Sequence, residues 1–170
     1  DRANAALTFV VDTSGSMDRA DRLGLVKQAL TEMISELDDD DTVAIVTYGD
    51  ISAIVLEPTL VRDDDEIYDA IDDLRPGGST NLEAGLRTGY ELAEQAYAEG
   101  GINRVILASD GVANVGTTDP DALSREITDR AINGIQLVTV GFGMGNYNDT
   151  IMEQLADEGV GFYAYVDTLN

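Results

Sequence analysis

The chain has 170 residues with 10 basic and 33 acidic side chains, so its formal net charge is −23, and 44% of its residues are hydrophobic. This hydrophobic fraction is that of one globular domain with a buried core. The charge argues against nucleic acids and anionic membranes as partners, because both are bound by basic surfaces. No apolar run approaches the roughly 18 residues that a membrane span needs.

Short β-rich runs alternate along the chain with segments of helical periodicity. Residues 6–11 are almost entirely apolar, as in a strand that is buried on both faces of a parallel sheet. The runs at 42–48 and 53–56 are close enough in sequence to form a hairpin, which predicts an antiparallel edge strand. In chain order we expect a strand at 6–11, a helix at 23–37, strands at 42–48 and 53–56, helices at 64–74 and 82–98, a strand at 104–108, a helix at 120–134, a strand at 136–141, a helix at 149–157 and a strand at 161–166.

Residues that begin or end helices support this order. Pro76 follows the helix at 64–74, and the residue before a proline disfavours helical backbone. Asp119 and Pro120 have the residue types of an N-cap and a first helical position. No repeat or linker divides the chain, so we expect residues 1–170 to form a single domain. Because the chain begins at Asp1 and has no signal-peptide pattern, we expect it to be an excised piece of a longer protein.

Strands separated by helices predict an α/β fold: a doubly wound, mostly parallel six-stranded sheet with one antiparallel edge strand and helices on both faces. Ligands of such sheets bind at the carboxyl ends of the strands, where the strand order reverses. The loops that follow the strands are therefore the place to search for functional residues.

Oxygen-bearing side chains gather in two of these loops and in a third loop, between two helices, at the same edge of the sheet. Asp12, Ser14 and Ser16 follow the first strand, Asp110 follows the strand at 104–108, and Thr80 precedes a helix. The chain has neither cysteine nor histidine, so thiolate and imidazole ligands are absent, and the oxygen ligands that remain are expected to bind a hard cation. Each of Ser16, Thr80 and Asp110 taken alone could be a turn or capping residue, but their shared edge favours a metal site.

These residues resemble the metal-ion-dependent adhesion site of von Willebrand factor type A (VWA) domains, which have this Rossmann-like fold. The match covers the Asp-x-Ser-x-Ser motif at 12–16, Thr80 and Asp110, and the order of elements agrees over nearly the whole chain. The segments 77–81 and 107–112 are similar to a bacterial branch related to calcium-activated chloride channel-like proteins.

The resemblance implies that Ser14 and Ser16 bind the metal directly, and that Asp12, Thr80 and Asp110 bind it directly or through water. The ion is expected to be Mg²⁺, with Mn²⁺ or Ca²⁺ as alternatives, and a protein partner would add an Asp or Glu carboxylate. The family favours a location outside the cytoplasm or on the cell surface. VWA domains usually close with a helix after the last strand, and we expect this chain to lack it.

Two other functions remain open at this point. The domain could be a structural spacer whose metal is purely structural. A phosphatase of the haloacid dehalogenase type also begins with an aspartate after its first strand, but it needs a second aspartate two residues later, where this chain has Ser14. Its phosphate-binding lysine would have to be Lys27, which falls within the first predicted helix. We therefore predict a binding module with no catalytic residues.

Overall fold

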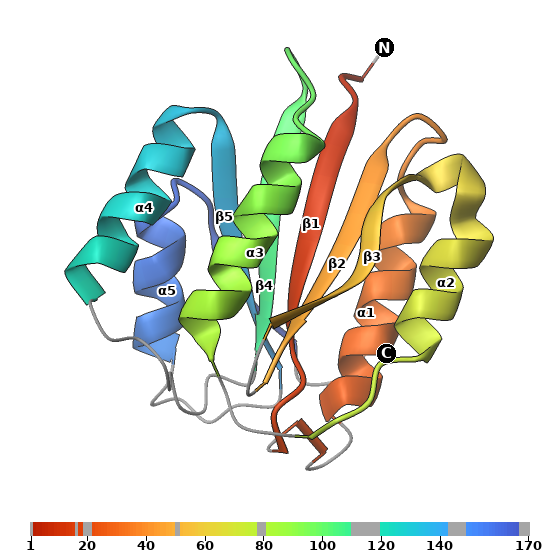
Figure 1. The fold of residues 1–170 in the computed structure, drawn as a ribbon, viewed down its shortest axis with the longest axis horizontal. Helices are drawn as coiled ribbons and strands as arrows, with labels where there is room; N and C mark the ends of the chain where they lie inside the picture. The colour runs from red at the N-terminus through yellow and green to blue at the C-terminus, as the bar shows by residue number, and fades with distance from the viewer. Residues whose placement is uncertain are drawn as a thin grey trace.

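The computed structural model describes residues 2–15, 17–18, 22–49, 52–77, 81–109, 120–142 and 149–166 (Figure 1). The strands are β1 (Ala5–Asp12), β2 (Thr42–Tyr48), β3 (Ser52–Leu60), β4 (Ile102–Ser109), β5 (Ile135–Phe142) and β6 (Tyr163–Val166). The helices are α1 (Arg22–Ser35), the short 3-10 helix η2 (Val61–Asp63), α2 (Asp64–Asp72), α3 (Leu82–Gln95), α4 (Pro120–Ile132) and α5 (Asp149–Glu158).

The six strands form one sheet in the order β3-β2-β1-β4-β5-β6. All neighbouring pairs are parallel except β2 and β3, which are antiparallel, so the predicted fold class and edge strand are confirmed. The chain moves outward from β1 through β2 to β3 and then returns to β4 on the other side of β1. The strand order therefore reverses between β1 and β4, which is where such sheets bind ligands.

Helices cover both faces of the sheet (Figure 1). On one face α1 and α2 pack on apolar side chains that include Phe9 and Ile45. On the other face α3, α4 and α5 pack on side chains that include Val10 and Leu107. Successive residues of β1 and β4 thus point into different cores, which explains why consecutive residues in the middle of these strands, such as 9–11 and 105–108, are apolar.

The structure differs from the prediction in where some elements end. β3 extends to Leu60, beyond the predicted end at residue 56, and it contains Pro58. A proline lacks the N–H of a central strand but is tolerated at an edge, where one side of the strand has no neighbour. α3 ends at Gln95, three residues before the predicted end.

A buried carboxylate fixes the amino-terminal segment beside β2. Asp41 is fully buried and accepts hydrogen bonds from the main-chain N–H groups of Ala5, at 2.7 Å, and Asp38, at 2.8 Å. It also pairs with the Arg2 guanidinium. Burial alone would raise the pKa of Asp41, but the bonds from Ala5, Arg2 and Asp38 outweigh burial and lower it. Asp41 is therefore a charged anchor in the folded protein.

The carboxyl end of α5 has a left-handed residue that carries a branched side chain. Val160 has φ of 57°, its N–H donates to Asp157 O, and the next N–H, that of Gly161, donates to Ala156 O. These two bonds define a Schellman motif, in which glycine is the usual left-handed residue. The exposed Val160 is consequently strained.

An aromatic ring lies between α3 and α4. Tyr90 is fully buried, and the Arg130 guanidinium carbon is 5.4 Å from the centre of its ring. Its hydroxyl has no hydrogen-bond partner among the described residues. Burial raises the pKa of Tyr90 well above its ordinary value, so the ring stays neutral.

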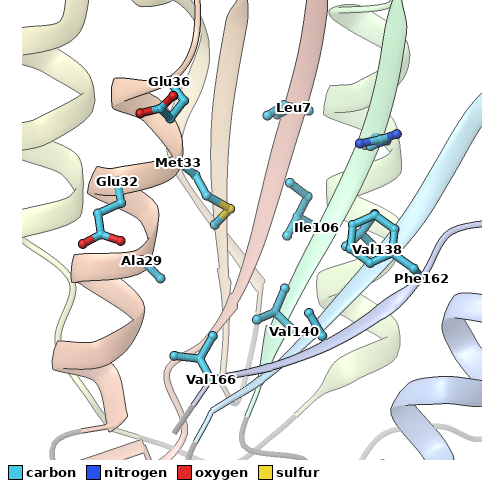
Figure 2. A pocket seen from close by; sticks show the side chains of 12 residues that line it. Leu7, Ala29, Glu32, Met33, Glu36, Ile106, Val138, Val140, Phe162 and Val166 are labelled. Carbon is cyan, nitrogen blue, oxygen red and sulfur yellow. The ribbon is translucent and has the colours of Figure 1, made fainter. Parts of the chain in front are cut away.

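An apolar groove of about 430 Å³ lies on the α1 face of the sheet. Ala29 and Met33 of α1 lie on one side of it, and Ile106, Val140 and Val166 line the sheet (Figure 2). Residues 167–170 are outside the described residues, so the expected absence of a closing helix stays a prediction. No helix of the described part of the chain is both long and apolar enough to cross a membrane.

Candidate metal centre

The loop after β1 begins with a buried carboxylate. Asp12, the last residue of β1, is fully buried, and Ser14 is 3% exposed. The main-chain N–H of Ser14 donates to Asp12 Oδ1 at 2.8 Å, so the loop folds back on the side chain of its own first residue. The N–H of Met17 donates to Ser14 O at 2.9 Å, and Met17 is buried in the core under α1. These contacts fix the backbone on both sides of Ser14.

The end of β4 contributes a second contact to the same carboxylate. Ser109 Oγ donates to Asp12 Oδ2 at 2.9 Å, and Ser109 is 5% exposed. The register of the two strands pairs Val11 with Ala108, which places Asp12 beside Ser109. The strand ends that meet at the reversal of strand order are therefore in direct contact, as the topology predicted.

A third loop reaches the site from the segment between α2 and α3. The N–H of Gly77 donates to Thr13 O at 2.7 Å, which joins this segment to the residue between Asp12 and Ser14. At the other end of the segment, Asn81 Oδ1 accepts the N–H of Ala84 at 3.1 Å and caps α3. Residues on both sides of Thr80 are thus fixed.

The end of β2 supports the loop from the side. The main-chain carbonyl of Tyr48 accepts a hydrogen bond from the Thr13 N–H at 3.2 Å and a longer one from Thr13 Oγ1 at 3.4 Å. The Tyr48 side chain is buried in the core beneath α3. The position of the loop after β1 therefore depends on how β2 packs against α3.

Only part of the predicted ligand set can be placed. Asp12 and Ser14 lie at the strand reversal, whereas Ser16, Thr80 and Asp110 are outside the described residues. Within the described residues no three His, Cys, Asp or Glu side chains form a group that could hold a metal. The five-residue site therefore stays a prediction.

Sequence reasoning assigned no role to Ser109. Its only signal was its place directly before Asp110, at the end of a strand. The link from Gly77 to Thr13 was also missed, because periodicity does not reveal contacts between main-chain atoms of separate loops.

The donor atoms of this edge are those of a site for hard cations. The described side chains, Asp12 and Ser14, offer carboxylate and hydroxyl oxygens, and the predicted ones add only more of the same kind. Mg²⁺ and Ca²⁺ bind such oxygens, whereas softer metals prefer nitrogen or sulfur. The residues present therefore fit a divalent hard cation.

Comparison with known proteins identifies related sequences. The profile of the von Willebrand factor type A domain family matches residues 6–170. The uncharacterized protein YfbK of Escherichia coli is 43% identical over 164 residues, which cover 96% of this chain and 28% of that protein. Human inter-alpha-trypsin inhibitor heavy chain H3 is 28% identical over 92% of this chain and 18% of its own length. The chain thus spans less than a third of these relatives.

Solved structures share the fold. A von Willebrand factor type A structure from Catenulispora acidiphila superposes with a TM-score of 0.81 at 21% identity, covering 98% of this chain and 39% of that chain. The conserved hypothetical protein BatB from Bacteroides thetaiotaomicron superposes with a TM-score of 0.80 at 20% identity. The match covers 98% of this chain and 92% of that chain.

Proposed function

Because the chain belongs to the von Willebrand factor type A domain family, we propose that it is a metal-dependent protein-binding module. The proposed ligands are Asp12, Ser14, Ser16, Thr80 and Asp110. The observation that carries the proposal is the buried Asp12 carboxylate, held at the strand reversal by Ser14 N–H and Ser109 Oγ. A buried carboxylate with oriented oxygens at this edge is a pre-organised cation ligand.

The chain's own residues would act by orienting oxygens before the ion arrives. Both carboxylate oxygens of Asp12 accept hydrogen bonds, and the main chain of Ser14 is fixed by its N–H bond to Asp12 and by the Met17 N–H bond to its carbonyl. When bound, the cation supplies a Lewis-acidic position that a carboxylate oxygen of a partner can fill. Mg²⁺ is the proposed ion, with Mn²⁺ or Ca²⁺ as alternatives.

The partner's chemistry follows from charge. The two proposed aspartates neutralise the formal charge of a divalent cation, and the chain as a whole has a net charge of −23. At physiological salt the Debye length is about 8 Å, so attraction to the ion is confined to its neighbourhood. We propose that the partner presents one Asp or Glu within a neutral or basic patch, which would meet the acidic surface around the site.

Metal titration tests the proposal directly. Calorimetric addition of Mg²⁺ or Mn²⁺ to chelator-treated protein is expected to show one site. The double variant Asp12→Ala, Asp110→Ala is expected to lose it while keeping the circular dichroism of the parent. Metal binding by this variant with the parent's affinity would refute the assignment.

The vacant coordination position needs its own test, because a purely structural ion would have none. Water-proton relaxation of the Mn²⁺-loaded protein is expected to show exchanging water on the ion, and acetate is expected to reduce it. An ion without exchanging water would support the structural-spacer alternative instead. For a partner once found, binding is expected to disappear with chelator and to weaken as salt rises.

We propose in addition that the domain is not an enzyme. The chain has no histidine or cysteine, and its candidate carboxylates are assigned to the metal. Hydrolysis of a generic phosphate ester, abolished by Ser14→Ala, would contradict this proposal.

The 43% identity to an E. coli protein supports placing the chain in a bacterial branch of the family. Its suggested relation to channel-like proteins stays a proposal, and a tree built from many homologous domains would test it.

A further inference from the structure

We propose that Ser109 is a positioning residue that sets the orientation of the Asp12 carboxylate for cation binding. The inference rests on the proposed metal site and deepens it. Ser109 is not one of the five proposed ligands, and its role would be exerted through Asp12.

The contact is direct and shielded from water. Ser109 Oγ lies 2.9 Å from Asp12 Oδ2, while the Ser14 N–H lies 2.8 Å from Oδ1. Hydrogen bonds to an ionised acceptor are stronger than those between neutral groups, and burial strengthens them further. Because each carboxylate oxygen accepts a hydrogen bond from one of these two groups, rotation about the Cβ–Cγ bond of Asp12 would break at least one of the two bonds.

The register of the sheet places the hydroxyl where this bond requires it. Alternation along β1 puts Asp12 on the same face as Val10, and alternation along β4 puts Ser109 on the same face as Leu107. Both Val10 and Leu107 pack in the core beneath α3. The two polar side chains thus end neighbouring strands on the face that carries α3, whose first turn follows Thr80.

A fixed carboxylate matters most for a cation with strict geometry. Mg²⁺ requires near-octahedral ligands at about 2.0–2.1 Å, whereas Ca²⁺ accepts variable geometry at about 2.3–2.6 Å. Removing the Ser109 hydroxyl would let the carboxylate turn and would therefore harm Mg²⁺ binding more than Ca²⁺ binding. This difference in selectivity distinguishes positioning from a general loss of stability.

The test uses the whole chain and the metal ions alone. Mg²⁺, Mn²⁺ and Ca²⁺ are titrated calorimetrically into the parent, Ser109→Ala, Ser109→Cys and Ser109→Thr, and urea unfolding in chelator measures the stability of each. Ser109→Ala is expected to lower Mg²⁺ affinity by about tenfold or more, as is typical when a residue that orients a metal ligand is removed. Ser109→Cys resembles serine in shape but has a weaker donor, so it is also expected to lower the Mg²⁺ affinity. Ser109→Thr keeps the hydroxyl and is expected to retain the Mg²⁺ affinity of the parent.

Thr139→Val is the matched control. Thr139 is a fully buried hydroxyl residue in β5 whose Oγ1 donates to Met152 O at 2.8 Å, away from the site. The Thr139→Val variant is expected to have a lower free energy of unfolding than the parent but the same Mg²⁺ affinity.

Three outcomes would overturn the role of Ser109 while leaving the metal site standing: parent-like Mg²⁺ affinity in Ser109→Ala, equal weakness in Ser109→Thr, or an equal loss in Thr139→Val. Absence of metal binding by the parent would instead refute the proposed function, and the role of Ser109 with it.

Discussion

A single methyl group added to α3 is expected to displace the loop after β1, which contains the proposed metal ligands Asp12 and Ser14. Gly85 faces Tyr48, and a Cβ added at Gly85 would lie 2.7 Å from Tyr48 Cβ and 2.8 Å from its Cγ. Tyr48 cannot avoid this clash by changing rotamer, because its own Cβ is fixed by the backbone. Gly85→Ala must therefore push β2 away from α3, and the Tyr48 carbonyl that holds Thr13 moves with it.

The size of the effect follows from two opposing contributions. Overpacking a buried contact costs about 1–3 kcal/mol, while alanine gains about 1 kcal/mol over glycine in a helix. Because the Tyr48 contact involves a backbone-fixed atom, we place the cost at the upper end and expect a net loss of about 2 kcal/mol. For a chain of this size that loss lowers the melting temperature by about 4–8 °C. A loop shift of a few tenths of an ångström also approaches the roughly 0.5 Å tolerance of a ligand site.

Gly89→Ala, one turn later on the same helix, is the matched control. Its added Cβ would meet Val10 Cγ2 at 2.4 Å, with the next atom 3.7 Å away, so the clash involves one terminal methyl group. We expect both variants to lose stability in urea unfolding with chelator present, but only Gly85→Ala to weaken Mg²⁺ binding in calorimetry. Parent-like stability in Gly85→Ala would refute the close approach of α3 to β2. Equal metal affinities in the two variants would refute the transmission through Tyr48.

Three further variants test other features of the fold. Because the folded pKa of Asp41 is lowered, its stabilisation is present above the ordinary carboxyl pKa and is lost as pH falls through the folded value. Asp41→Asn is therefore expected to cost about 2 kcal/mol at neutral pH in urea unfolding, and the difference from the parent should shrink in acid. Tyr90→Phe removes a buried hydroxyl and is expected to raise the free energy of unfolding by about 1 kcal/mol; a loss would reveal a partner for that hydroxyl. Val160→Gly relieves a left-handed valine that costs about 1–2 kcal/mol, so calorimetry should show a higher melting temperature, and an unchanged one would contradict the strain.

The fold could be predicted because its signals are local. Strands β1 and β4 are recognisable as apolar runs, and Pro76 correctly predicts that the helix at 64–74 ends before it, although α2 already ends at Asp72. The end of β3 could not be predicted, because Glu57 and Pro58 are the residue types of a strand end. Whether proline terminates a strand depends on whether a neighbouring strand lies on the side where the missing N–H would point. The arrangement of the whole sheet decides this.

The candidate site was predictable only to the level of its loops. Asp12 and Ser14 stand out because they follow an apolar strand at the edge that binds ligands. Their supporting contacts could not be found this way: Ser109 is 97 residues from Asp12, and Tyr48 is 35 residues from Thr13. Such contacts depend on strand register and helix packing, to which hydrophobic periodicity is insensitive.

The strand reversal explains why the site and its supports belong to different parts of the chain. At this point the crossover from β1 passes over one face through α1, while the return to β4 passes over the other through α3. β1 is followed by α1 on one face of the sheet and β4 is followed by α4 on the other, so side chains at the two strand ends can meet between the two crossovers. Asp12 and Ser109 meet at this point through their hydrogen bond. The main chain of Thr13, the residue after Asp12, is bonded to Gly77 and to Tyr48. A ligand set built in this way is rigid only if the sheet, α3 and the α2–α3 segment are all in place, so metal affinity should report on packing as far away as Gly85.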